Sequence, residues 1–143
     1  MRVVGRDQET SWLAELIDGA STAAPSSVTT IEAVAGAGKS AVIALAAQLA
    51  EQEGVRVLRC QPSAAEAQYA YAALGDLLHT VPSLDAIEPV PRRALERALL
   101  RAEHDVAEQL DARAIGLGCA ALWSDLAATQ PLLLLIDDVH WLD

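Results

Sequence analysis

The feature that most constrains this 143-residue chain is the aliphatic run Leu132 to Ile136 within "PLLLLIDDVHWLD". The run shows no alternation of apolar and polar residues, so neither face of a strand formed by it is suited to water. Such a strand is typical of a parallel sheet that helices cover on both faces. The run therefore predicts an α/β fold, and it puts Asp137 and Asp138 at the carboxyl end of a buried strand, where open α/β sheets bind ligands.

A strand, a glycine-containing loop and a helix follow one another nearer the N-terminus. "VTTIEAV", Val28 to Val34, is rich in β-branched residues and predicts a strand. The loop Ala33 to Gly38 comes next, and an apolar helical period begins at Lys39, with Val42, Leu45 and Leu49 on one face. Gly54 is the expected end of that helix.

"AVAGAGKS", Ala33 to Ser40, fits the phosphate-loop pattern G-x-x-x-x-G-K-[ST] except at its first position. Gly36 and Gly38 allow a sharp turn, Lys39 supplies a flexible cation, and the Ser40 hydroxyl suits Mg²⁺. Alanine at position 33 would cost on the order of 1 kcal/mol if its backbone required a positive φ. The alternative interpretation is a simple turn that carries a surface lysine.

The two aspartates complete a candidate site. Asp137 and Asp138 end a buried strand, where carboxylates are costly unless a cation balances them. We expect Asp137 to hold Mg²⁺ through its water shell and Asp138 to orient an attacking water. Taken alone, the pair would fit an ordinary turn or helix cap equally well.

Composition narrows the class of protein further. The chain is 52% hydrophobic but only 3% aromatic, which is ample for one compact domain of alanine-rich helices on aliphatic strands. Its net charge of −10 disfavours contact with nucleic acid by this segment. Lys39 is the single lysine among ten basic residues.

The remaining pattern predicts one more strand and four more helices. The strand is "VRVLRC", Val55 to Cys60. The helices begin at Asp7 (inward residues Trp12, Leu13, Leu16 and Ile17, ending near Gly19), span Ala65 to Val81 (inward residues Tyr71, Leu74, Leu77 and Leu78), lie between Pro91 and Glu108, and span Ile115 to Thr129. Arg93, Arg97 and Arg101 form one row, which fits a solvated helix face or, less often, a partner-docking stripe.

Neither secretion nor metal-thiolate chemistry is indicated. Cys60 and Cys119 are far apart and have no C-x-x-C spacing, so we expect two reduced, buried thiols. The N-terminus meets charges too early for a signal peptide, and the longest apolar run is too short to span a bilayer. We expect a cytoplasmic protein without membrane contact.

With its phosphate-loop pattern and its paired aspartates, the chain resembles the start of the ATPase domain in the STAND branch of the AAA+-related P-loop NTPases. It is most similar to the large ATP-binding regulators of the LuxR family. "VVGRDQE" resembles that family's V-G-R-x-x-E, and "AVAGAGKS" resembles its G-x-A-G-x-G-K-S. "PLLLLIDDVHWLD" resembles its hydrophobic-D-D-x-H-W-x-D block, which is the most specific of the three.

The resemblance implies a role for each matching residue. Val4, Gly5 and Arg6 would lie near the adenine and ribose of ATP, and the phosphates would contact Ala35, Gly36, Ala37, Gly38, Lys39, Ser40 and Ala41. Ser40 and Asp137 would hold Mg²⁺, and Lys39 and Asp138 would act in catalysis. His140 and Trp141 would shape the loop after the Walker B strand, which is the run at 132–136 that ends in the two aspartates. Plain core packing explains Trp141 equally well.

The same resemblance implies a P-loop NTPase three-layer α/β/α fold with a mostly parallel sheet, left incomplete after the Walker B strand. In the family, a strand that follows Walker B inserts between the strand at 28–34 and the strand at 132–136. We therefore expect residues 1–143 to be the N-terminal part of an AAA-like ATP-binding domain, with a leading helix and linker at 1–24 and the P-loop core at 25–143. Such a segment would be marginally stable and prone to self-association, and DNA binding would come from a C-terminal domain outside it.

Three functions fit these features. The first is a switch that binds ATP and Mg²⁺ in a signal-responsive transcriptional regulator, with slow or no hydrolysis. The second is a small P-loop kinase or active ATPase that binds a substrate on the helices between Ala64 and Thr129. The third is a fragment that binds no nucleotide. Turnover separates the first two, and ATP binding separates both from the third.

Overall fold

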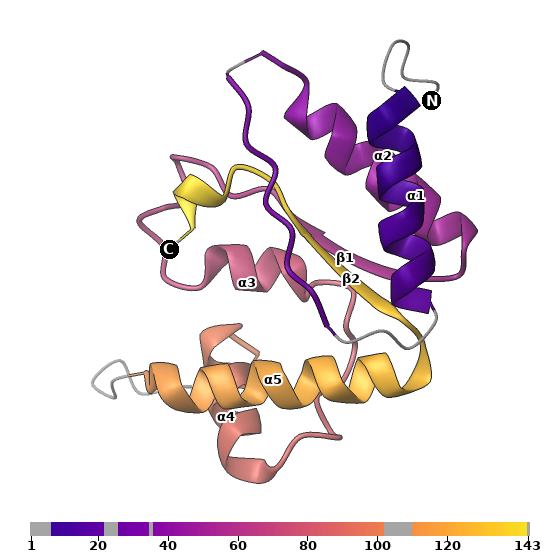
Figure 1. Ribbon diagram of the computed structural model, residues 1–143. Coiled ribbons are helices and arrows are strands. Elements are labelled where there is room, and N and C mark those ends of the chain that lie inside the picture. Colours follow the sequence, from indigo (N-terminus) through magenta and orange to yellow (C-terminus); the bar gives the residue numbers. More distant parts are fainter. Residues whose placement is uncertain (1–6, 22–25, 35, 102–109, 143) are drawn as a thin grey trace.

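The computed structural model describes residues 7–21, 26–34, 36–101 and 110–142. These residues form helices packed on a small parallel sheet (Figure 1). In chain order the elements are α1 (Asp7–Ser21), α2 (Lys39–Gln52), β1 (Arg56–Cys60), α3 (Ala72–Leu77), α4 (Pro89–Ala98), α5 (Ala112–Thr129), β2 (Leu132–Ile136) and the 3-10 turn η1 (Val139–Trp141).

The sheet is a parallel pair of β1 and β2. Arg56 lies opposite Leu132, and the register continues without a bulge to Cys60 opposite Ile136. One backbone bond extends the ladder at each end, from the Arg56 N–H to the Pro131 carbonyl (2.8 Å) and from the Asp137 N–H to the Cys60 carbonyl (3.1 Å). The expected strand at Leu132–Ile136 is confirmed, and so is the one at Val55–Cys60, apart from its first residue.

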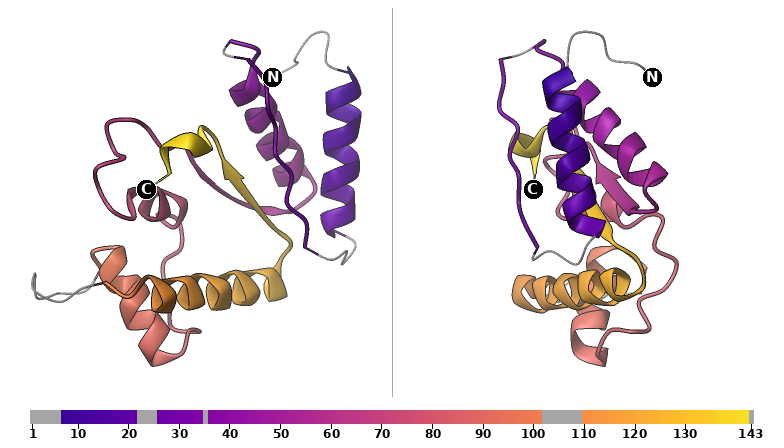
Figure 2. Two further views of the ribbon diagram at one scale, coloured as in Figure 1. Left: turned by 60° about the vertical axis from the view of Figure 1, so that its left-hand side comes forward. Right: turned by 45° about the vertical axis from the view of Figure 1, so that its right-hand side comes forward.

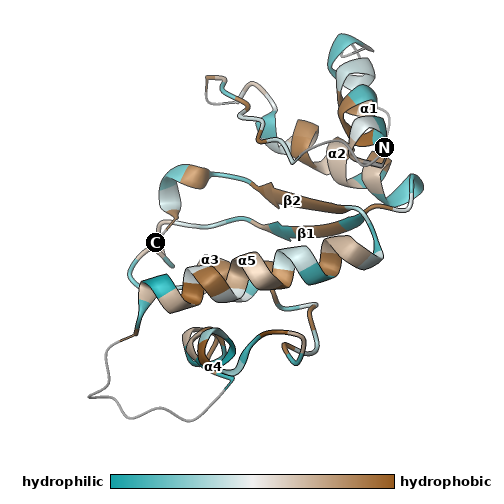
Figure 3. Ribbon diagram, turned by 60° about the horizontal axis from the view of Figure 1, so that its bottom comes forward, coloured by the Kyte–Doolittle hydropathy of each residue, from teal (hydrophilic) through white to brown (hydrophobic). Residues whose placement is uncertain are grey.

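Helices lie on both sides of this sheet, as the aliphatic run predicts (Figure 3). On one side, Leu133 and Leu135 pack against α1 and α2 through Leu13, Val42 and Ala46. On the other side, Leu132 and Leu134 join a larger cluster with residues of α3, α4 and α5. Successive leucines of β2 therefore enter opposite layers, because side chains of a strand alternate between its two faces.

The larger cluster includes the pair of α4 and α5, which lie below the sheet in Figure 3, where α5 is seen lengthwise and α4 nearly end-on. Leu95 of α4 and Leu122 of α5 are among the most deeply buried side chains. Close approach depends on Gly118, since a Cβ there would lie 2.9 Å from the Pro91 carbonyl oxygen and 3.3 Å from the Leu95 Cβ. The helix expected at Ile115–Thr129 is confirmed and begins three residues earlier, where the Asp111 side chain caps it.

The strand expected at Val28–Val34 is wrong. The segment Ser26–Val34 is without regular secondary structure, and only Ile31 is half-buried. The β-branched residues favour a strand, but strand structure also needs a ladder partner. Within the described part of the chain, β2 pairs only with β1.

Two expected helices are shorter than their apolar pattern suggests. Instead of Ala65–Val81, α3 covers Ala72–Leu77, because a turn held by Ser63 and Glu66 precedes it and Tyr71 takes a left-handed conformation (φ 63°). The helix expected between Pro91 and Glu108 is α4, which begins at Pro89 and ends at Ala98, just before Leu100 turns left-handed (φ 54°). Residues 102–109 lie outside the described part.

Side-chain burial corrects one further detail. In α1, Leu13 and Ile17 are buried, whereas Trp12, expected to face inward, is exposed. Positions 13 and 17 are one helical turn apart and form the contact stripe, so Trp12 lies on its flank.

The row Arg93, Arg97 and Arg101 is not a uniformly solvated face. Arg101 donates from Nη2 to the Leu78 carbonyl (2.7 Å) and from Nη1 to the Val81 carbonyl (3.0 Å). Its guanidinium thereby adds a charged donor to two carbonyls that follow α3, of which that of Leu78 also accepts from the Val81 N–H (3.0 Å). Arg93, by contrast, is exposed and makes no hydrogen bond or ion pair with a described residue.

The cysteines are both free, as expected. Burial raises the pKa of the Cys60 thiol above its ordinary value, and the charge of Asp76 raises it further. Burial also raises the pKa of half-buried Cys119. Both thiols therefore stay protonated at neutral pH, which makes them poor nucleophiles. Among the helices that the structure describes, none is long and apolar enough to cross a membrane.

We predict opposite effects for alanine at the two glycines of α5. Gly118→Ala should destabilise the fold by about 1–3 kcal/mol, because its Cβ would press on the backbone of α4. Gly116→Ala should stabilise it by about 0.5–1 kcal/mol, because a Cβ there meets nothing within 4 Å and alanine favours the helix. Urea unfolding of both variants measures the difference, and equal stabilities would contradict the close α4–α5 contact.

We predict that Arg101→Ala lowers the free energy of unfolding by about 1–2 kcal/mol, because two carbonyl groups lose a charged donor. Arg93→Ala is the matched control, with an expected change within about 0.5 kcal/mol. Thermal or urea unfolding monitored by circular dichroism makes the comparison. A loss of the same size in both variants would show that the row acts through charge and not through the α3 carbonyls.

Candidate functional site

The loop before α2 has the geometry of a tight turn followed by a helix start. The Ala37 N–H donates to the Val34 carbonyl (3.2 Å), and Gly36 takes φ 77°. Gly38 is the N-cap of α2 with φ 83° and ψ 32°. Because L-residues rarely adopt such angles, the two glycines make this entry into the helix inexpensive.

The N-terminus of α2 is left uncapped. No side chain caps it, and its first turn contains no acidic residue. Across the described residues, none accepts a hydrogen bond from the backbone N–H of Gly38, Lys39 or Ser40. These N–H groups and the positive end of the helix dipole together favour an anion at this position.

The Lys39 side chain folds back over the loop. Its Nζ donates to the Ala33 carbonyl (3.0 Å) and lies 3.5 Å from the Val34 carbonyl. Neither carbonyl belongs to a ladder, and that of Val34 also accepts from the Ala37 N–H (3.2 Å). The ammonium is exposed and reaches the loop from the same helix end as the uncapped N–H groups. The phosphate-loop pattern did not indicate this contact, because the pattern specifies residue types and not their partners without a ligand.

Asp137 is the buried acidic residue of the site. It is 7% exposed, and its backbone N–H continues the ladder to Cys60. Its Oδ1 accepts a hydrogen bond from the Asp138 N–H (3.0 Å), and it takes part in no ion pair with another described residue. A buried carboxylate with one neutral donor is short of positive charge. Its chemistry therefore fits a divalent cation such as Mg²⁺, which prefers oxygen ligands.

Asp138 turns the chain away from the strand. It adopts a left-handed conformation (φ 48°, ψ 44°) and serves as the N-cap of η1, where its carbonyl accepts from the Trp141 N–H (2.9 Å). Aspartate and asparagine tolerate this conformation better than other L-residues with a Cβ. The turn gives the two aspartates different surroundings, since Asp137 is buried and Asp138 is half-buried.

The loop before α2 and the carboxyl end of β2 lie at the same end of the sheet (Figure 2). The contact of Val42 with the cluster around Leu135 holds the first turn of α2 against β2. The structure thus brings the loop with Lys39 and Ser40 to the side of the sheet where Asp137 and Asp138 end the strand. This edge is where parallel sheets bind ligands.

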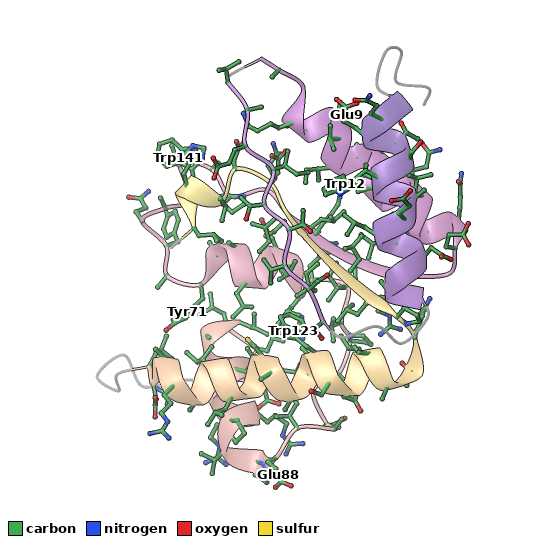
Figure 4. All side chains as sticks on the ribbon, viewed as in Figure 1. Glu9, Trp12, Tyr71, Glu88, Trp123 and Trp141 are labelled. Carbon is green, nitrogen blue, oxygen red and sulfur yellow. The ribbon has the colours of Figure 1, made fainter. Side chains whose placement is uncertain are left out.

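Other predicted site residues are placed differently. Val4, Gly5, Arg6 and Ala35 lie outside the described residues. Ala37 and Ala41 are half-buried in the loop and the first turn of α2. His140 and Trp141 are in ring contact, with centroids 4.9 Å apart. Trp141 is 40% exposed and lies at the rim of the molecule (Figure 4), so core packing does not explain it.

Metal ligands of protein origin are few. In the ranges that the structure describes, no three histidine, cysteine, aspartate or glutamate side chains form a group that could hold a metal ion. A site with one carboxylate and one hydroxyl is instead typical of Mg²⁺ bound mainly by phosphate and water.

Comparison with known proteins agrees with this arrangement. The chain matches the model of the AAA ATPase domain over residues 2–143. No curated protein and no solved structure was found to match it. The match covers nearly the whole sequence, including the loop at 33–40 and the aspartates at 137 and 138. The chain therefore belongs to the AAA ATPase domain family.

Proposed function

We propose that this domain binds ATP with Mg²⁺ and acts as a nucleotide switch in a signal-responsive transcriptional regulator similar to the LuxR-type STAND proteins. The observation that best supports nucleotide binding is the uncapped N-terminus of α2, where Gly38 takes a left-handed conformation and Lys39 follows it. Family membership supports the same conclusion. The "DDVHW" block supports the narrower assignment to a regulator.

The proposed roles follow from the chemistry of each group. The backbone N–H groups of Gly38, Lys39 and Ser40 would bind the phosphates, and the Lys39 side chain would move from the loop carbonyls to the outer phosphates. Ser40 and Asp137 would hold Mg²⁺, which when bound offsets the charge of the phosphates. The segment with Val4, Gly5 and Arg6 would contact the adenine and ribose, as the resemblance implies.

Hydrolysis in this proposal is slow or absent. Asp138 is the candidate for orienting water, and it adopts a left-handed conformation next to buried Asp137. An aspartate reaches less far than a glutamate at the same position would. The domain then changes state mainly by exchange of ATP for ADP, which suits a switch.

The contacts of the arginines disfavour a kinase that binds an anionic substrate on α4. Arg92 pairs with Asp85 (3.2 Å) and lies 3.9 Å from Glu96, and Arg101 is bonded to carbonyls of the α3 region. These two cations are already partnered, and Arg93 is the exposed arginine of α4 that makes no ion pair with a described residue. A vigorous ATPase stays the alternative that a turnover measurement would detect.

The wider setting is part of the proposal. The two-stranded sheet would be the described part of a three-layer α/β/α P-loop core. DNA contact would come from another segment of such a regulator, because a net charge of −10 repels phosphate backbones. We place the domain in the cytoplasm, where ATP and reduced thiols coexist.

We predict that Lys39→Ala weakens binding of a fluorescent ATP analogue by at least about tenfold, because a charged hydrogen bond to phosphate contributes about 1.5–3 kcal/mol. Arg93→Ala removes an equal charge from a residue without described contacts and should leave the Kd unchanged. Titration of the three proteins by fluorescence anisotropy gives the comparison. Equal affinity of the Lys39→Ala and unaltered proteins would remove the phosphate-loop assignment.

We predict that substitution of Asp137 impairs metal binding, whereas substitution of Asp138 impairs the activation of water. Asp137→Asn should abolish the gain in ATP affinity that Mg²⁺ gives, because a neutral amide balances no cation. Asp138→Asn should keep the left-handed turn and the ATP affinity while lowering any phosphate release. Mg²⁺ titrations and a phosphate-release assay test both, and undiminished Mg²⁺ dependence in Asp137→Asn would contradict its role.

A further inference from the structure

Arg59 of β1 is a cation on the aliphatic face of the sheet on which α2 packs. The register places it opposite Leu135, and it shares a face with that residue because side chains of paired strands alternate together. The other strand residues of this face, Val57 and Leu133, pack in the cluster with α2. Arg59 is exposed, and within the described part of the chain its guanidinium makes no hydrogen bond or ion pair. Packing of the described residues therefore does not explain this charge.

Asp137 continues the same face on β2. It follows Leu135 by two positions, and the bond from its N–H to the Cys60 carbonyl shows that the ladder extends to it. A strand spacing of about 4.8 Å and a rise of about 3.3 Å per residue put the backbones of Arg59 and Asp137 about 8 Å apart. An arginine side chain spans much of that distance, yet no ion pair joins the two residues.

A ligand between these two side chains needs two kinds of charge. It has to offer a cation to the buried carboxylate of Asp137 and an anion to the guanidinium of Arg59. A phosphate group that carries Mg²⁺ offers both, since the metal prefers carboxylate oxygen and the phosphate oxygens accept from arginine. The pair of residues therefore fits the metal-bound end of a phosphate chain.

The path of α2 leaves the carboxyl end of β1 open. The first turn of the helix packs through Val42 in the cluster with Leu135 of β2. At its last turn, the Ala50 carbonyl accepts from the Val55 N–H (2.8 Å), one residue before β1 begins. The helix thus starts over the end of β2 and finishes at the start of β1. Arg59, near the other end of β1, lies beyond the uncapped start of the helix. A phosphate chain that begins at α2 and crosses the end of β2 reaches it last.

We propose that Arg59 contacts the terminal phosphate of bound ATP and so makes the site prefer a triphosphate to a diphosphate. This inference rests on the proposed function and adds to it a specificity-determining residue from outside the phosphate loop. The N–H groups at the start of α2 bind phosphates that ATP and ADP share. Only ATP has a further phosphate that extends to β1, where the planar fork of donors on a guanidinium suits two of its oxygens.

Binding of ADP and of a non-hydrolysable ATP analogue, each with Mg²⁺, tests the proposal by isothermal titration calorimetry on the whole chain. We expect Arg59→Ala to raise the Kd of the ATP analogue about tenfold, because a charged hydrogen bond to phosphate is lost, and the Kd of ADP by less than about twofold. Arg59→Lys keeps the charge without the fork, so its Kd for the ATP analogue should lie between those of Arg59→Ala and the unaltered protein.

Arg56→Ala is the matched control. It removes the same charge from the same strand, but the register puts Arg56 at the opposite end of β1, and its position in the alternation puts it on the opposite face. Both Kd values should stay within about twofold of those of the unaltered protein. A variant that is partly unfolded loses affinity for both nucleotides by the same factor, so the ratio of the two Kd values isolates the contact with the terminal phosphate.

The outcomes separate this role of Arg59 from the proposed function. Equal changes of both Kd values in Arg59→Ala, or no change in either, would overturn the contact, and the function would stand if Lys39→Ala still weakens binding. Loss of the Mg²⁺ dependence with an unchanged ratio would assign Arg59 to the carboxylate of Asp137 and would also overturn the contact. Absence of nucleotide binding by the unaltered protein would overturn both.

Discussion

The parallel pairing of β1 with β2 is the interaction on which the rest of this structure depends. It aligns Arg56 with Leu132 and Cys60 with Ile136, and the added bond from the Asp137 N–H to the Cys60 carbonyl fixes where the strand ends. The positions of the two aspartates at the candidate site depend on where β2 ends. Asp137 is buried because it still belongs to the ladder, and Asp138 turns away because the ladder has stopped. The same pairing gives the helices two faces to cover, one for α1 and α2 and one for the other helices.

Much of this arrangement could be predicted from the sequence, and the reasons are physical. The unbroken run Leu132–Ile136 can be satisfied only between two apolar layers, so strand position and helix coverage follow together. The start of α2 was equally predictable, because Gly38 and Lys39 mark the change from loop to helical period. The predicted strand at Val28–Val34 is absent because a strand also needs a partner strand, and the β propensity of these residues does not reveal whether one is present. The length of α3 failed for a related reason, since the Ser63–Glu66 turn and the left-handed Tyr71 override a favourable apolar pattern.

Contacts between distant residues were beyond the reach of sequence periodicity. Arg101 lies in a row that looks solvated, and its bonds to Leu78 and Val81 arise only because the fold places the residue after α4 beside residues 78–81. Likewise, the pattern at 33–40 identifies Lys39 but says nothing about which oxygens its ammonium contacts. At the candidate site the sequence could supply the chemical groups and their order. Their burial, and the unequal settings of the two adjacent aspartates, came from the fold.

The position of the Lys39 ammonium has a consequence for selectivity. Because it already rests on the Ala33 and Val34 carbonyls, a ligand gains only the difference between two sets of contacts when the lysine moves to it. A weakly charged anion such as chloride offers little more than those carbonyls do, whereas a polyphosphate offers several strong acceptors at once. We therefore expect the Lys39 ammonium to stay on the loop carbonyls in the presence of common small anions, and to leave them for ligands with a high density of negative charge.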